Sequence, residues 1–170
     1  MVKPRLAFHH GVARLSGCFG DHLSDVTLAF CGDAEAGWLR LPYDNTFLLE
    51  ALTNSSLELQ YSDRLPIEQD LLWKWLFDLH LVRYPVGAEA RLITLFQLLV
   101  NRFGIRRGDG YLLPIPLGHA RIAELIGATR STVTRQISQL RKLNHLQLIE
   151  PDGIFLLSAP LVESTTSLNT

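Results

Sequence analysis

One segment, HARIAELIGATRSTVTRQISQLRK (residues 119–142), restricts what this chain can fold into more than any other. Apolar residues recur at helical spacing on both sides of Gly127, which predicts a helix over about residues 118–126 and a second helix ending near Leu143. Gly127 can take the left-handed conformation that ends a helix, and Thr129 can cap the next one. The small or apolar residues expected to fill the contact between the helices are Ile122, Ala123, Leu125, Ile126, Val133 and Ile137.

The second helix would direct polar and basic side chains outward from its first turns. These are Arg130, Ser131, Thr134 and Arg135. An arginine fork can bond both acceptors of a guanine in the major groove, and hydroxyl groups suit phosphates. Residues 125–149 contain no Asp or Glu, in a chain whose formal net charge is −1. Their Lys and Arg residues are Arg130, Arg135, Arg141 and Lys142. Taken alone, this pattern equally fits a solvated basic face on an ordinary helical hairpin.

A predicted β-hairpin after the second helix favours the DNA-binding interpretation. LQLIE and IFLLS, within residues 146–158, flank the turn residues Pro151-Asp152-Gly153. A hairpin in this place turns a helix-turn-helix into a winged helix.

Upstream of this pair, the spacing of apolar residues predicts a well-buried helix from Ala88 to Phe103, ended by Gly104. Residues 107–110 are expected to form a turn. An extended run then covers residues 111–115, in which Pro114 suits an edge position.

Before residue 65 the sequence is typical of short strands joined by turns. Runs such as VARL, VTLAF, WLRL and LELQY lie between turn residues, and about five strands fit. From Pro66 the period becomes helical and predicts a helix over about residues 67–83. Its apolar seam consists of Leu72, Trp75, Leu76, Leu79 and Val82.

The composition excludes several classes of protein. With 170 residues, 47% of them hydrophobic, the chain can bury a core in one large or two small domains and is not disordered. No apolar run approaches the ~20 residues of a membrane span, and we expect no signal peptide, no membrane partner and a cytoplasmic location. Cys18 and Cys31 are too few for a disulfide framework.

No motif of an enzyme or of a bound cofactor is present. The sequence has no nucleophile elbow, P-loop or H-E-x-x-H motif, so we expect neither catalysis nor a cofactor. Residues of metal-ligand type do occur near the N-terminus, but no C-x-x-C pair joins them, and two cysteines cannot hold an iron–sulfur cluster. These residues are His9, His10, Cys18, His22 and Cys31, and no metal site is expected.

Residues 86–158 resemble the C-terminal domain of the CRP/FNR family of bacterial transcription regulators. The motif IAxxIGxTRxTVTRxxxxLRK and the preceding AEARLITLFQLLV carry the resemblance. It implies that Arg130 and Arg135 read bases, and that Ser131 stands where many relatives carry a glutamate. It also places His119 near a usual phosphate contact. In the binding mode that we expect, Thr132, Lys142 and the wing contact phosphates together with His119. Gly118 in place of a Ser or Thr cap, and the polar Gln136, depart from the family pattern.

The N-terminal part resembles the family's β-roll effector domain, in DVTLAFCGDAEAGWLRL and EALTNSSLELQ. About 65 residues precede the long helix, so the roll is expected to be shortened. The phosphate-binding segment of cyclic-nucleotide binders is absent, and only Arg40 lies nearby. We therefore expect no cyclic-nucleotide binding and assign Arg40 to the surface.

The helix over residues 67–83 resembles the family's dimerisation helix, and its seam could pair in parallel with a second copy. The residues expected at that interface are Leu72, Trp75, Leu76 and Leu79. In the alternative, Trp73, Trp75 and Phe77 cover the roll within one chain.

The expected fold class is α+β: a small truncated β-roll (residues 1–65), a dimerisation helix (66–84), a C-terminal winged helix-turn-helix (85–160) and a flexible tail (161–170). The expected function is that of a homodimeric transcription regulator that binds double-stranded DNA at an inverted repeat, with RNA polymerase as a further partner. Two alternatives remain: a regulator that senses a small metabolite such as 2-oxoglutarate, and a protein-interaction adaptor that has kept the winged helix.

Overall fold

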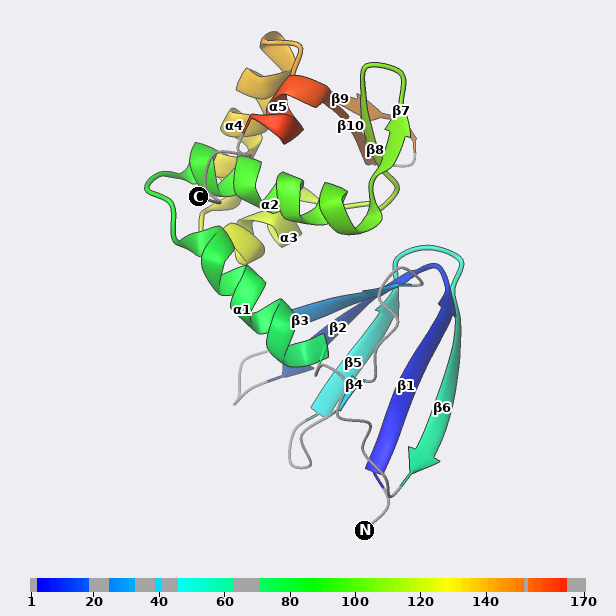
Figure 1. Ribbon diagram of the computed structural model, residues 1–170. Coiled ribbons are helices and arrows are strands. Elements are labelled where there is room, and N and C mark those ends of the chain that lie inside the picture. Colours follow the sequence, from blue (N-terminus) through cyan, green and yellow to red (C-terminus); the bar gives the residue numbers. More distant parts are fainter. Residues whose placement is uncertain are drawn as a thin grey trace. The chain divides into compact units, whose positions relative to one another are not determined.

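The computed structural model shows an α+β fold, as predicted (Figure 1). It consists of two compact units, residues 1–78 and 79–170, and helix α1 (Leu71–Arg83) begins in the first unit and ends in the second. The structure describes residues 3–18, 25–32, 39–40, 46–62, 71–151 and 153–164.

The first unit contains two antiparallel sheets, each of three strands. One has the order β4 (Leu39–Arg40), β1 (Lys3–His10), β6 (Ser56–Ser62). The other has the order β3 (Val26–Gly32), β2 (Val12–Cys18), β5 (Thr46–Ala51). The runs VARL, VTLAF, WLRL and LELQY, which the sequence predicted as strands, correspond to β2, β3, β4 and β6. The strands β1 and β5 were not among those runs, since KPRLAFHH and TFLLEA do not alternate cleanly between apolar and polar residues.

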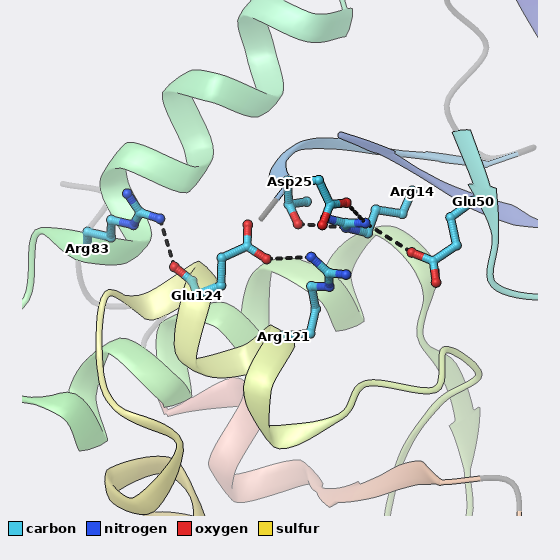
Figure 2. Close-up of polar contacts among 7 residues, drawn as sticks. Arg14, Asp25, Glu50, Arg83, Arg121 and Glu124 are labelled. Carbon is cyan, nitrogen blue, oxygen red and sulfur yellow. Dashed lines mark hydrogen bonds and ion pairs between the residues drawn. The ribbon is translucent and has the colours of Figure 1, made fainter. Parts of the chain in front are cut away.

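Strand β2 is central in its sheet, and most of its side chains are buried. Among them is Arg14, which is only 2% exposed. Its Nε donates to Thr27 Oγ1 (2.7 Å), and its guanidinium pairs with Asp25 (2.6 Å) and Glu50 (3.0 Å), as Figure 2 shows. A buried charge is tolerated when it is paired and hydrogen-bonded, so these neighbours allow an arginine inside the first unit.

The inner face of α1 holds Trp75, which is fully buried and meets Phe30 of β3 edge to face, with ring centroids 5.4 Å apart. Leu72 and Leu79 are each 8% exposed. Of the four residues expected at a dimer interface, only Leu76 is accessible, at 41% exposure. Three of the four residues predicted for a dimer seam thus pack within the single chain, and pairing through α1 stays a prediction.

The alternative, in which three aromatic residues cover the roll, holds for Trp75 alone. Trp73 is 72% exposed and Phe77 is 55% exposed. Helix α1 is apolar on two sides. The residues that the sequence pattern assigned to a dimer interface lie mostly on the side that faces the interior of the chain.

The second unit is built around α2 (Ala88–Phe103), whose predicted bounds are confirmed. Phe96 of α2 packs against Phe155 with ring centroids 5.3 Å apart, which joins the helix to a four-stranded sheet. The order of that sheet is β7 (Ile105–Arg107), β8 (Gly110–Leu113), β10 (Ile154–Ser158), β9 (Leu146–Ile149). The predicted wing is thus β9 and β10, extended by β8 and β7.

Strand β8 is an interior strand, not the edge that Pro114 suggested. It ends at Leu113, so Pro114 lies just beyond it. A proline has no N–H to give to a neighbouring strand, and ending β8 before Pro114 avoids that loss.

A short helix, α5 (Ala159–Glu163), follows the wing and was not predicted. Leu161 is 6% exposed, and its carbonyl accepts a hydrogen bond from the Gln97 amide at 3.1 Å. Residues 161–163 are therefore packed structure, although they were assigned to a flexible tail.

Several predicted features lie outside the described residues. These are the helix start at residues 66–70, Asp33 and Gly37 of the glycine-rich loop, His22, Asp152 of the wing turn, the end of the tail from residue 165, and the side chain of Arg40.

Within the described ranges, no helix is long and apolar enough to cross a membrane. The same residues contain no group of three or more His, Cys, Asp or Glu that could hold a metal ion.

Candidate nucleic-acid interface

The turn between α3 (His119–Ile126) and α4 (Arg130–Lys142) is formed as the sequence predicts. Gly127 adopts the left-handed conformation, with φ 63° and ψ 49°. The N–H of Ala128 donates to the carbonyl of Ala123 at 2.9 Å, which closes the end of α3. A residue with a side chain is strained in this conformation, so glycine at this position fixes where α4 begins.

Helix α4 begins with a side-chain cap from Thr129, as predicted. Thr129 Oγ1 accepts from the backbone N–H of Thr132 at 3.2 Å. The same oxygen lies 2.9 Å from Ser131 Oγ and 2.9 Å from Thr132 Oγ1. The three hydroxyl groups therefore form one cluster at the start of α4. Such capping satisfies N–H groups that have no partner inside the helix.

An apolar core beneath α4 holds this helix against α3. All six residues predicted for it are at most 6% exposed, and Leu140 at 2% joins them. They are Ile122, Ala123, Leu125, Ile126, Val133 and Ile137. A close-packed core of this kind gives the outer face of α4 a defined orientation.

The outer face of α4 carries the predicted polar and basic residues. Arg130, Ser131, Thr134 and Arg135 are all exposed. Neither arginine of this set has an ion pair among the described residues. Their guanidinium groups are thus accessible, and no acid in the described part of the chain neutralises them, which favours contact with a polyanion.

The residues for which phosphate contacts were expected lie around this face. Lys142 is exposed at the end of α4, and Thr132 is half-buried in its first turn. His119 is half-buried at the start of α3. A cation at the end of a helix also stabilises that helix through its dipole, so Lys142 has a structural role as well.

His119 and Thr134 are joined by a contact that the sequence did not predict. His119 Nδ1 lies 2.9 Å from Thr134 Oγ1, and that hydroxyl donates to the Arg130 carbonyl at 3.0 Å. The contact connects the first turn of α3 to α4.

The two departures from the family pattern have visible consequences. Gly118 precedes α3 and provides no side-chain cap. Gln136 is half-buried, and its Oε1 is buried without a hydrogen-bond partner in the described part of the chain. A buried acceptor without a partner costs stability, so Gln136 is a weak point in the packing of α4.

Comparison with known families gives a match over the second unit. Residues 90–160 match the Crp-like helix-turn-helix domain family, which is less than half of the 170-residue chain. The chain is 39% identical over 59 residues to the global nitrogen regulator of Synechocystis sp., which covers 35% of this chain and 26% of that protein. The global nitrogen regulator of Synechococcus elongatus is 43% identical over 53 residues, which covers 31% of this chain and 24% of that protein.

A longer alignment joins the chain to a probable transcriptional activator of Rhizobium leguminosarum bv. viciae. The two are 29% identical over 113 residues, which covers 62% of this chain and 45% of that protein. The alignments thus span from about a quarter to less than half of the length of these three relatives.

Solved structures share the fold across nearly the whole chain. A CRP-family transcriptional regulator from Thermus thermophilus has a TM-score of 0.65 at 15% identity, covering 95% of this chain and 87% of that chain. FixK2 from Bradyrhizobium japonicum has a TM-score of 0.65 at 19% identity, covering 91% of this chain and 82% of that chain. At these identities the comparison establishes the fold alone, and it includes the sheets of the first unit.

Proposed function

We propose that this chain, whose residues 90–160 form a Crp-like helix-turn-helix domain, is a DNA-binding transcription regulator of the CRP/FNR type. The observation that carries the proposal is the exposed pair Arg130 and Arg135 on a helix with a side-chain cap and a buried inner face. These arginines lie in residues 125–149, which contain no Asp or Glu. A basic surface without acids attracts the phosphates of DNA.

In this proposal the first turns of α4 enter the major groove. Arg130 and Arg135 read base edges, because a guanidinium fork matches the two acceptors of guanine. Ser131 has a short side chain that reaches less far than a glutamate, so the base opposite it is selected weakly. His119, Thr132 and Lys142 contact phosphates and set the orientation of α4 on the duplex.

We further infer that two copies pair through the outer stripe of α1. Trp73, Leu76 and Phe77 are exposed there at helical spacing, and Leu81 of the same helix is exposed as well. Such apolar residues are the ones that a partner could cover. A symmetric pair would place two α4 helices about one DNA turn apart, ~34 Å, and would bind an inverted repeat. Binding beside a promoter would bring the protein close to RNA polymerase.

Selection of bound sequences from a random pool of duplex DNA tests the proposal. The wild-type chain should enrich an inverted repeat, whereas a variant with Arg130→Ala and Arg135→Ala should enrich none. If the wild type enriches no sequence, the proposed function is wrong. A parallel selection with 2-oxoglutarate identifies the metabolite-sensing alternative, in which enrichment would depend on the added acid.

A further inference from the structure

Two arginines that the sequence pattern did not single out converge on the end of α3. Arg83 is the last residue of α1. Its Nε donates to the Leu125 carbonyl (2.9 Å), and its Nη2 donates to the Glu124 carbonyl (2.8 Å). Figure 2 shows Arg83 reaching Glu124 from α1. Arg91, in the first turn of α2, donates to the Ile126 carbonyl (3.4 Å) and to the Pro85 carbonyl (2.9 Å).

The carbonyls at the end of a helix have no N–H partner from a following turn, and they carry the negative end of the helix dipole. The last three residues of α3 are Glu124, Leu125 and Ile126, and the carbonyl of each accepts from one of the two guanidinium groups. The Glu124 carbonyl also accepts from the Gly127 N–H at 3.3 Å, so the arginines are the additional donors at this helix end. Charged donors make stronger hydrogen bonds than neutral ones. The end of α3 is therefore held from outside by α1 and α2.

The two side chains also lie beside the turn that leads into α4. A Cβ built on Gly127 would stand 3.9 Å from Arg91 Nη1 and 4.0 Å from Arg83 Cδ and Nε. Gly127 is where the chain changes direction between α3 and α4, the helix that we propose enters the major groove. By holding the carbonyls just before Gly127, Arg83 and Arg91 also restrict the direction in which α4 leaves the turn.

We propose that Arg83 and Arg91 form a clamp that positions α4 for sequence-specific DNA binding and ties it to the end of α1. This inference rests on the proposed function and adds two positioning residues to it. Arg83 is the stronger member, because its planar fork donates to two neighbouring carbonyls at once. The contact also gives a displacement of the end of α1 a direct path to the recognition helix.

The test uses Arg83→Gln and Arg83→Lys in the full chain. Glutamine removes both the charge and the planar fork of donors, whereas lysine keeps the charge but loses the fork. Both variants should therefore reduce the ratio of specific to non-specific DNA affinity by about tenfold, the scale of one hydrogen bond to a charged group. Arg107→Gln is the matched control, since it removes one exposed arginine from β7. It should leave the ratio of specific to non-specific affinity unchanged. A specificity ratio that stays at the wild-type value in Arg83→Lys overturns the clamp, because charge alone would then suffice.

Hydrogen exchange on the free protein provides a readout that needs no DNA. In Arg83→Gln the amides of Gly127 and Ala128 should exchange faster, while amides within α2 keep the wild-type rate. Unchanged exchange at the turn overturns the clamp even if the protein binds DNA. Faster exchange in a protein that selects no DNA sequence would refute the proposed function and the positioning role while leaving the contact itself real.

Discussion

Trp75 of α1 points into the first unit and meets Phe30 of β3 at a centroid distance of 5.4 Å, with the ring planes at 60°. Both residues are fully buried. This pair fixes the rotation of the first turns of α1 about its own axis. It therefore decides which apolar residues of α1 are left for a partner, namely those on the side that carries Trp73 and Phe77.

Trp75→Ala should lower the free energy of unfolding by about 3–5 kcal/mol, because it leaves a large cavity beside Phe30. Trp73→Ala removes the same side chain from a position that is 72% exposed, and should change stability by less than about 0.5 kcal/mol in the monomer. Urea unfolding followed by circular dichroism at low protein concentration measures both. Equal effects of the two substitutions would contradict the orientation of α1.

The double substitution Trp73→Ala and Phe77→Ala should weaken self-association by at least about tenfold, because aromatic residues at the centre of an interface contribute most of its energy. Sedimentation over a range of concentrations measures the change. Val86→Ala, at a position that is 96% exposed on the connection between α1 and α2, is the control and should leave the dimer intact. A wild-type chain that stays monomeric at high concentration would refute the dimer.

Arg130→Ala should cost about 1–3 kcal/mol on the preferred DNA site and should blunt discrimination at one base pair. Fluorescence anisotropy with the preferred site and with single-base variants measures both quantities. Normal binding of the preferred site by this variant would show that Arg130 reads no base.

Lys142→Ala should behave differently, since a phosphate contact carries no sequence information. It should weaken binding to all sequences by a similar factor and reduce the slope of log affinity against log salt by about one. Titrations at several salt concentrations, on preferred and random duplexes, distinguish this result from a loss of specificity.

The exposed cluster around Glu163 predicts a pH dependence. Tyr111 and Arg106 each donate to the Glu163 carboxylate at 2.8 Å, and these two bonds hold its pKa below the ordinary value. A carboxylate with a lowered pKa in the folded state favours folding above its unfolded-state pKa, and this contribution disappears as the pH falls through the folded-state value. Glu163→Gln should therefore lower the Tm near neutral pH and match the wild type in strong acid. A difference that persists unchanged in acid would contradict the assignment.

Local signals allowed much of the second unit to be predicted. Gly127 and Thr129 were identified because a left-handed turn and a helix cap depend on residues within a few positions of one another. The resemblance to the CRP/FNR family is confirmed for residues 90–160. The exposure of Arg130 and Arg135 followed from helical spacing once the buried side of α4 was known.

The features that were missed depend on distant parts of the chain. Helix α1 is apolar on two sides, so spacing could not tell whether Trp75 or Trp73 faces inward. Arg83 meets α3 across 41 or 42 positions of sequence, and no local pattern marks such a contact. Helix α5 has five residues, too few for a helical period to be visible.

The docking of α5 sets the shortest useful fragment of this protein. The family match stops at residue 160, but the carbonyl that receives the Gln97 amide belongs to Leu161. Cutting the chain at the edge of the match would remove that acceptor together with the buried Leu161 side chain. A winged-helix piece meant for crystallisation or DNA titration should therefore retain residues through Glu163.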